Sequence, residues 1–197
     1  MDKNQKESIE AKVILLGNSG VGKTCLIKSV INEKFNEGEM PSTFMSFQVK
    51  EIKIKSINYV LNLWDTLGQE QYKSISDIFF RGSDIAIFVY DITQKQSFDD
   101  LNFWIKKLED NLNTGTKCIY GILGNKTDKY REQEVNEKEA RNYAKSKGIK
   151  FATASAKIDP TSFENFLIEL VKDASDNLLS KSGKLYLKYP KKKRWKC

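Results

Sequence analysis

The stretch Val13-Ile14-Leu15-Leu16-Gly17-Asn18-Ser19-Gly20-Val21-Gly22-Lys23-Thr24 decides the fold that we expect for this chain. Its apolar start predicts a buried strand, its glycines a tight loop, and its end the first turn of a helix. Glycines let backbone N–H groups close around an anion, and the dipole of the following helix adds positive potential. The spacing brings Lys23 to the outer oxygens of a nucleotide's phosphates and the Thr24 hydroxyl to Mg²⁺. A plain glycine turn would explain the glycines, but not the lysine, the hydroxyl and the strand together.

The composition indicates one globular domain. The chain has 197 residues, of which 40% are hydrophobic and 30% charged, which is enough for one well-packed domain with tails and too little for two ordinary domains. No apolar run approaches the roughly 18 residues that a membrane span needs, and residues 1–10 are too polar for a signal peptide. The three cysteines lack metal-type spacing and histidine is absent, so we expect no zinc site and a reducing, cytosolic compartment.

The net charge of +7 comes from the C-terminal stretch. Residues 181–197 hold eight basic residues and no acidic one, which leaves 25 basic against 26 acidic residues in 1–180. We therefore expect an N-terminal extension over 1–10, a folded domain over 11–179 and a flexible basic tail over 180–197. A nucleic-acid-binding module that uses Lys191 to Arg194 is an alternative. It lacks interleaved aromatic residues beyond Trp195, so we expect no nucleic-acid partner.

Strand and helix patterns alternate along the domain. The expected strands cover residues 13–16, 47–54, 59–63, 85–90, 118–123 and 151–154. The expected helices cover residues 23–32, 98–112, about 140 to 148, and 162–179. The strands at 47–54 and 59–63 read as an antiparallel hairpin with a turn at 56–58, and a change of apolar phase predicts an irregularity near Lys50. The alternation favours an α/β sandwich with a mostly parallel sheet.

Four polar stretches lie just past or just before expected strands, where ligands of open α/β sheets bind. They are Thr43, Asp65-Thr66-Leu67-Gly68-Gln69-Glu70, Asn125-Lys126-Thr127-Asp128 and Ser155-Ala156-Lys157. In this order after a phosphate-binding loop, they resemble the motifs of small GTPases of the Ras superfamily, and the resemblance covers residues 10–175. Within that superfamily the chain is most similar to the Rab family. The markers of that family are Trp64-Asp65-Thr66 with Gln69-Glu70, Phe80-Arg81-Gly82, Phe88 to Thr93, Ser97-Phe98, Trp104 and Ser19.

The resemblance implies a P-loop NTPase sandwich: a six-stranded, mostly parallel sheet with one antiparallel strand and helices on both faces. It also implies bound GTP or GDP with Mg²⁺. The nucleotide-binding residues expected from it are Gly17, Asn18, Ser19, Gly20, Val21, Gly22, Lys23, Thr24, Cys25, Phe35, Thr43, Asp65, Gly68, Asn125, Lys126, Asp128, Ser155, Ala156 and Lys157. A purely structural role for Cys25, as a small core residue, is also open.

Guanine selection follows from Asp128. Its two carboxylate oxygens can accept the ring N–H and the exocyclic amine of guanine, a donor pair that adenine lacks. By resemblance, Asn125 supports the loop, the Lys126 stem covers a ring face and Phe35 lies across the ribose and base. The Ala156 N–H is expected to face the guanine carbonyl oxygen. A solvated polar turn is the alternative for residues 125–128.

We expect metal binding and hydrolysis to depend on Thr24, on Thr43 and on the stretch from Asp65 to Gln69. Mg²⁺ prefers six oxygens and keeps several waters, so we expect Thr24 and Thr43 as direct ligands and Asp65 as a ligand through water. Gly68 is expected to offer its N–H to the γ-phosphate, and Gln69 to orient the attacking water. Intrinsic hydrolysis is expected to be slow and to depend on an activator.

The expected function is a Rab-like switch in vesicle and membrane traffic. Exchange factors, activating proteins and effectors would bind its switch regions, and the monomeric protein would cycle between cytoplasm and the cytosolic face of an intracellular membrane. The basic tail and a prenyl group on Cys197 would hold it there. An unmodified solvated tail, or a nuclear-targeting run, is the alternative.

Three positions depart from the Rab pattern. Leu67 replaces the usual alanine, the segment Thr43 to Phe47 is one residue shorter and lacks a glycine, and Cys197 stands alone where paired cysteines are usual. These departures leave two other functions open: a nucleotide-binding scaffold that hydrolyses poorly, and a signalling switch of another Ras-superfamily branch. Phe47, Trp64 and Phe79 match an aromatic cluster between the Rab switches, although ordinary packing would also explain them.

Overall fold

The computed structural model describes residues 8–31, 46–66, 80–112, 115 and 117–183. Its strands are β1 (Ser8–Leu16), β2 (Ser46–Ile54), β3 (Ile57–Asp65), β4 (Ile85–Asp91), β5 (Ile119–Asn125) and β6 (Lys150–Thr153). Its helices are α1 (Lys23–Val30), α2 (Lys95–Asp99), α3 (Leu101–Asn111), the 3-10 helix η2 (Thr127–Glu132), α4 (Glu137–Ser146) and α5 (Pro160–Lys181).

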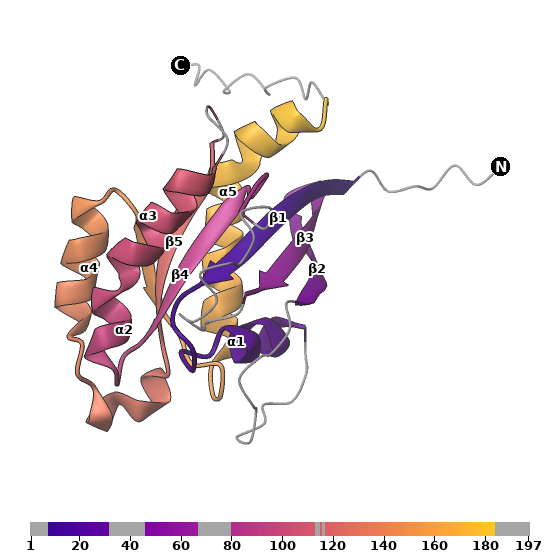
Figure 1. Cartoon of the computed structure of the whole chain (residues 1–197). Coiled ribbons are helices and arrows are strands. Elements are labelled where there is room, and N and C mark those ends of the chain that lie inside the picture. The colour runs from indigo at the N-terminus through magenta and orange to yellow at the C-terminus, as the bar shows by residue number, and fades with distance from the viewer. Residues whose placement is uncertain (1–7, 32–45, 67–79, 113–114, 116, 184–197) are drawn as a thin grey trace, which may run out of the picture.

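One six-stranded sheet forms the centre of the molecule (Figure 1). The strand order is β2-β3-β1-β4-β5-β6, and all neighbouring pairs are parallel except β2 with β3. The six strands, the single antiparallel strand and the helices packed around the sheet confirm the predicted fold class.

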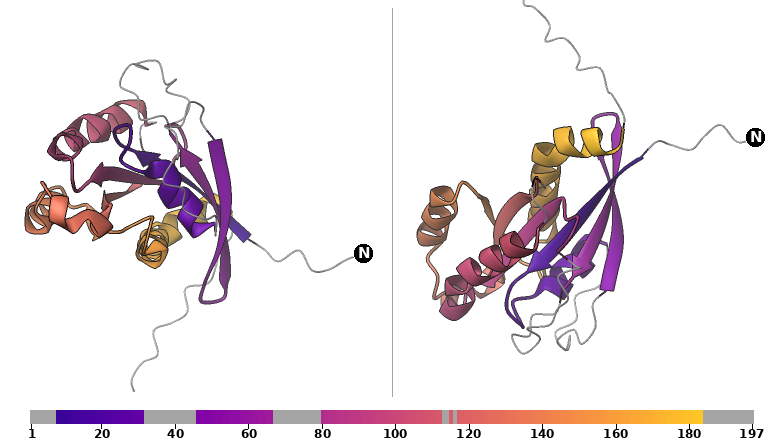
Figure 2. Two further views of the ribbon diagram at one scale, coloured as in Figure 1. Left: turned by 90° about the horizontal axis from the view of Figure 1, so that it is seen from below. Right: turned by 45° about the horizontal axis from the view of Figure 1, so that its top comes forward.

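Helices lie on both faces of the sheet (Figure 2), and a hydrophobic cluster packs between sheet and helices on each face. Val13 and Leu15 of β1 point into the cluster that contains α1 and α5 residues, whereas Ile14 and Leu16 point into the cluster with α3 and α4 residues. Successive side chains of a strand face opposite sides, so an apolar run is what a strand covered on both faces requires. All seven residues of β4 are buried, as its run of apolar residues predicts.

The predicted irregularity near Lys50 is wrong. The residues of β2 pair with those of β3 without interruption, from Ser46 opposite Asp65 to Ile54 opposite Ile57. Phe47 and Val49 are 53% and 50% exposed on one face of this edge strand, whereas Ile52 is 6% exposed on the other. The change of apolar phase therefore reflects apolar residues on both faces of a regular strand. The hairpin turn lies at residues 55–56, and β3 begins at Ile57, one residue inside the predicted turn.

Helix boundaries also differ from the predicted ones. The single helix expected over 98–112 is divided into α2 and α3 at Asp100, where φ is −76° and ψ is −4°. Helix α5 begins two residues earlier than predicted, at Pro160, because the Asp159 side chain accepts a hydrogen bond from the Ser162 N–H at 3.2 Å and Pro fits the first helical turn.

The C-terminal end of α5 lies at the end of the sheet where β4 begins (Figure 1). The Lys181 ammonium lies 3.0 Å from a carboxylate oxygen of Asp84, the residue directly before β4. The other carboxylate oxygen accepts the Lys12 N–H at 2.8 Å. Among the helices that the structure describes, none is long and apolar enough to cross a membrane.

Candidate nucleotide-binding site

The expected site residues lie where β1, β3, β4 and β5 end. These strands run in the same direction, so the segments that follow Leu16, Asp65, Asp91 and Asn125 emerge at one edge of the sheet. Open parallel sheets bind ligands at this edge. The structure therefore brings together motifs that are far apart in the sequence.

The expected phosphate loop, residues 17–22 between β1 and α1, passes very close to its neighbours. Gly17 has φ +147° and Gly22 has φ +94°, both in the region that favours glycine. A Cβ atom on Gly17 would lie 2.1 Å from the carbonyl oxygen of Val89, and one on Gly22 would lie 2.4 Å from the Asn125 amide nitrogen. Helix α1 begins directly after Gly22, a residue with no side chain to occupy the first-turn N–H groups, so these groups suit an anion.

Lys23 is folded back into the phosphate loop. Only 5% of the residue is exposed, and its ammonium donates to the carbonyl oxygens of Gly17 at 2.8 Å and Asn18 at 2.9 Å. Burial lowers the pKa of Lys23 to about 8, and the charge of Asp65 opposes this shift. The loop thus holds a positive charge among its own carbonyl oxygens, at the place where phosphates would supply negative charge.

Thr24 and Asp65 lie together beside this loop. The Thr24 hydroxyl donates to Asp65 Oδ2 at 2.7 Å, and Asp65 is 3% exposed. The next side chain, Thr66, donates its hydroxyl to the carbonyl oxygen of Leu15 and so ties the end of β3 to β1. A hydroxyl and a carboxylate are the hard oxygen donors that Mg²⁺ prefers, so these two residues fit the metal that the sequence predicts.

Asn125 joins three loops at the other end of the site. Its amide nitrogen donates to the carbonyl oxygen of Val21 in the phosphate loop at 2.8 Å. Its amide oxygen accepts the Ala156 N–H at 3.3 Å, so the N–H expected to face guanine contacts Asn125 in this structure. The Ser155 hydroxyl donates to Asp128 Oδ1 at 2.5 Å, which orients the carboxylate expected to select the base.

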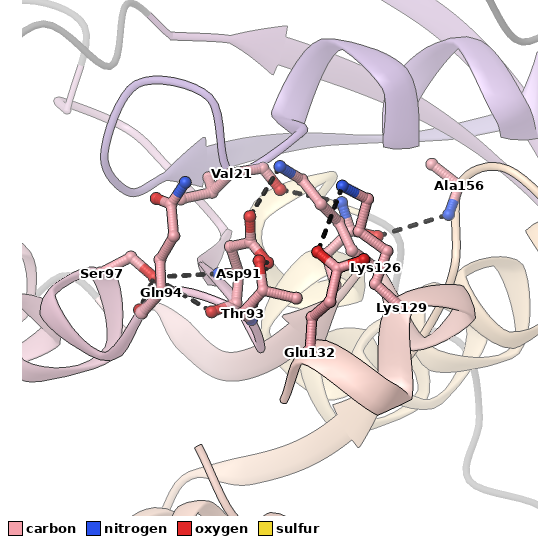
Figure 3. Close-up of polar contacts among 10 residues, drawn as sticks. Val21, Asp91, Thr93, Gln94, Ser97, Lys126, Lys129, Glu132 and Ala156 are labelled. Carbon is pink, nitrogen blue, oxygen red and sulfur yellow. Dashed lines mark hydrogen bonds and ion pairs between the residues drawn. The ribbon is translucent and has the colours of Figure 1, made fainter. Parts of the chain in front are cut away.

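The side chain of Lys126 reaches a residue that sequence reasoning missed. Its ammonium lies 2.6 Å from Oδ2 of Asp91 (Figure 3). Asp91 is fully buried at the end of β4. The available signal was the position of an acidic residue at the end of a continuous apolar run, because a buried charge requires a partner.

Asn18 is bound to helix α3 through its side chain. Its amide nitrogen donates to Asp100 Oδ2 at 2.6 Å, and its amide oxygen accepts the indole N–H of Trp104 at 2.8 Å. The sequence places Asn18 among the nucleotide-binding residues and Trp104 among the family markers, but neither pattern indicates that they touch.

The remaining expected residues differ in their exposure to solvent. Ser19, Gly20 and Lys157 are exposed, and Cys25 is half-buried against the α1–α5 cluster. Five expected site residues lie outside the described residues: Phe35, Thr43, Gly68, Gln69 and Cys197. Leu67 and Phe79 lie outside them too, whereas Phe47 stacks on Trp64 with ring centroids 5.3 Å apart.

Comparison with known proteins relates this chain to Ras-family and Rab proteins. The family model described as the Ras family matches residues 12–176. The chain is 36% identical to Ras-related protein Rab-13 of Bos taurus over 177 residues, which is 90% of this chain and 84% of the relative. It is 37% identical to Ras-related protein Rab-7a of Paramecium octaurelia over 167 residues, 83% of this chain and 81% of the relative. It is 40% identical to Ras-related protein Rab-21 of Geodia cydonium over 165 residues, 84% and 71% of the two chains.

Proposed function

Because this chain belongs to the Ras family of small GTPases, we propose that it is a Rab-type switch that hydrolyses GTP and regulates vesicle and membrane traffic. One arrangement carries the proposal: the buried Lys23 ammonium lies against the carbonyl oxygens of the phosphate loop, the Thr24–Asp65 pair lies beside this loop, and Asn125 joins the loop to the expected guanine-binding motifs. The similarity to several Rab proteins supports the trafficking role.

In the bound state, Lys23 leaves the carbonyl oxygens of its own loop and neutralises charge on the outer phosphates. Thr24 and Thr43 would hold Mg²⁺ directly, and Asp65 would hold it through water. Mg²⁺ itself supplies positive charge to phosphate oxygens. Gln69 orients the attacking water and Gly68 donates its N–H to the γ-phosphate, so hydrolysis depends on residues held in place by that phosphate.

Asp128 provides the direct test of nucleotide identity. The parent protein is expected to bind GDP and GTP with Mg²⁺ far more tightly than ATP, and to release phosphate slowly from GTP. Asp128→Asn is expected to weaken guanine nucleotides strongly, because a bidentate pair with a base contributes about 1–3 kcal/mol, and to favour xanthosine triphosphate, whose ring presents the complementary group. Competition against a fluorescent GDP analogue measures both. Tight ATP binding by the parent, or equal loss of both nucleotides in the variant, would contradict the assignment.

The outer face of the β2–β3 hairpin supports contacts with partners. Phe47 is 53% exposed and stacks on Trp64, and the Lys12 ammonium lies 5.0 Å from the centre of the Trp64 ring. We place part of the binding surface for exchange factors, activating proteins and effectors here, because exposed aromatic side chains dominate many interfaces. The protein acts as a monomer between these encounters.

Membrane cycling is assigned to residues 181–197. The eight basic residues there contribute at most about 1 kcal/mol each near an anionic leaflet, which gives a reversible, salt-sensitive attraction. A prenyl group on Cys197 supplies the second signal that stable anchoring requires. The protein thus moves between the cytoplasm and the cytosolic face of an intracellular membrane.

Leu67 favours a second candidate, a guanine-nucleotide-binding scaffold that hydrolyses poorly. Its bulk replaces alanine next to Gly68, the residue assigned to the γ-phosphate. The two candidates differ in one measurement, the phosphate released in a single turnover with a matched activating protein. A switch gives a large acceleration and the scaffold gives none. Leu67→Ala is the matched variant, since it restores hydrolysis only if the leucine is the cause.

A further inference from the structure

The buried carboxylate of Asp91 has no role in the chemistry described so far. Asp91 is the last residue of β4 and is fully buried. Its Oδ2 atom lies 2.6 Å from the ammonium of Lys126, whose side chain is 28% exposed. Lys126 is the residue whose stem is assigned to a face of the guanine ring, and within the described part of the chain its ammonium pairs with Asp91.

The carboxylate of Asp91 is fixed from its other side. Its Oδ1 atom accepts the Thr93 N–H at 2.9 Å and the Thr93 hydroxyl at 2.8 Å (Figure 3). The backbone of Asp91 is held as well, because its N–H donates to the Ser97 hydroxyl at 3.0 Å and its carbonyl oxygen accepts the Gln94 N–H at 3.0 Å. A side chain held by this many donors has one position, and a group paired with it is positioned too.

Lys126 also has an unusual backbone conformation. Its φ of 68° and ψ of 38° place it in the left-handed region, which residues with a Cβ atom adopt rarely and at functional sites in particular. Asp91 lies directly opposite Asn125 in the β4–β5 pairing, one residue before Lys126. The lysine stem therefore runs back from the loop after β5 toward the end of β4, along the base end of the site.

We propose that Asp91 is a positioning residue for nucleotide binding: it holds the Lys126 stem across the guanine position and thereby sets how long the nucleotide stays bound. The inference rests on the proposed nucleotide site. The Asp91–Lys126 pair lies in the part of the site that is expected to bind the guanine base. The γ-phosphate is expected to bind in the other part, near Lys23 and Thr24. Asp91 therefore slows the dissociation of GDP and GTP to the same extent and leaves the hydrolysis step unchanged.

The test compares dissociation rates of fluorescent GDP and a non-hydrolysable GTP analogue from full-length protein. Asp91→Asn keeps the size of the side chain and removes the charge that pairs with Lys126. Because the Asp91 end of this ion pair is buried and charges attract more strongly away from water, we expect both nucleotides to dissociate about tenfold faster or more. The rate of single-turnover hydrolysis of pre-bound GTP should stay within about twofold of the parent rate. In free energy, a twofold change in rate is less than half of the tenfold change expected for dissociation.

Two controls separate positioning from general weakening of the fold. Asp99→Asn removes the carboxylate of an exposed pair within helix α2, Asp99 with Lys95, that has the same 2.6 Å separation, and it should leave dissociation unchanged. In a Lys126→Met background, Asp91→Asn should have no further effect, because the group through which Asp91 acts is gone. A persistent effect there would show that Asp91 acts on the fold and would overturn the inference.

The outcomes also distinguish this inference from the proposed function. If the parent does not bind guanine nucleotides, the proposed function fails. If the parent binds them and Asp91→Asn releases them at the parent rate, the proposed function stands and this inference fails. Should Asp91→Asn not fold, Thr93→Val removes one donor to the same carboxylate. It should speed dissociation severalfold in the parent and not at all with Lys126→Met, since a single lost hydrogen bond is worth less than an ion pair; unchanged dissociation in the parent would overturn the inference.

Discussion

At the scale of single residues, Gly22 shows how closely the site is packed. An alanine at this position would be strained at φ +94°, and its Cβ would lie 2.4 Å from the amide nitrogen through which Asn125 holds Val21. We expect Gly22→Ala to displace Asn125 and weaken nucleotide binding at least about tenfold, the cost of one lost buried hydrogen bond with its desolvation. Equilibrium titration with labelled GDP measures this.

Gly148→Ala is the matched control for this substitution. Gly148 also has positive φ, +67°, but nothing lies within 4 Å of the position its Cβ would take. It should lower the melting temperature through backbone strain while leaving affinity for GDP unchanged. Equal loss of affinity in both variants would mean that strain, and not the contact with Asn125, is responsible.

Cys118 offers a prediction of pH dependence. Burial, with a smaller effect of the Asp84 charge, raises the pKa of the Cys118 thiol to about 12. A raised thiol pKa favours the neutral form, so only roughly a thousandth of Cys118 is thiolate at pH 9. The rate of alkylation by iodoacetamide should rise about tenfold per pH unit from 7.5 to 10 without levelling off. Peptide mass spectrometry separates this cysteine from the other two, and a plateau near pH 9 would refute the expectation.

At the scale of elements, Lys50 links the edge strand β2 to helices α1 and α5. Its ammonium donates to the carbonyl oxygen of Val30, the last residue of α1, at 2.6 Å, and lies 2.8 Å from Glu164 of α5. Lys50→Met keeps the stem and removes both contacts, so we expect a loss of about 1–2 kcal/mol and faster hydrogen exchange across β2. Lys53→Met on the exposed side of β2 is the control, and similar exchange in both variants would exclude this role for Lys50.

The sequence predicts elements well where both faces of a strand or one face of a helix are apolar. The strands β4 and β5 stand out because they are buried on both sides. The phase of β2 was misjudged because Phe47 and Val49 are apolar although half exposed, and periodicity cannot tell an outer apolar face from an inner one. The succession of strand, glycine loop and helix over residues 13–24 was predictable because it lies within one continuous stretch.

The contacts made between motifs were not predictable from patterns. Asp91 with Lys126, and Asn18 with Asp100 and Trp104, are pairs made by side chains from different elements. No local spacing encodes them, because each depends on the packing of the sheet and helices. Only Asp91 could be recognised from the sequence as a residue that needs a partner, because it is a charged residue at the end of a buried apolar run.

At the scale of the whole molecule, we expect the basic stretch and Cys197 to decide where the protein resides. Cys197→Ser is expected to move most of the protein from the membrane fraction to the supernatant, because charge alone gives a reversible attraction. Neutralising Lys191, Lys192, Lys193 and Arg194 should redistribute it among membranes without full release. Fractionation with intact-mass measurement checks both, and an unmodified Cys197 in the membrane fraction would rule out the lipid anchor.

Helix α5 connects the two ends of this molecule. It starts just after the Ser155-Ala156-Lys157 motif and ends where Lys181 meets Asp84, beyond the opposite end of the sheet. Its 22 residues correspond to about 33 Å of helix along the axis, and Phe163, Leu170 and Leu178 pack it on the core. Because this helix is packed on the core, we expect a dye at its C-terminal end to keep a fixed separation from the Ser155-Ala156-Lys157 motif. A change in energy transfer to a labelled effector would then report movement of the effector and not of the reference point.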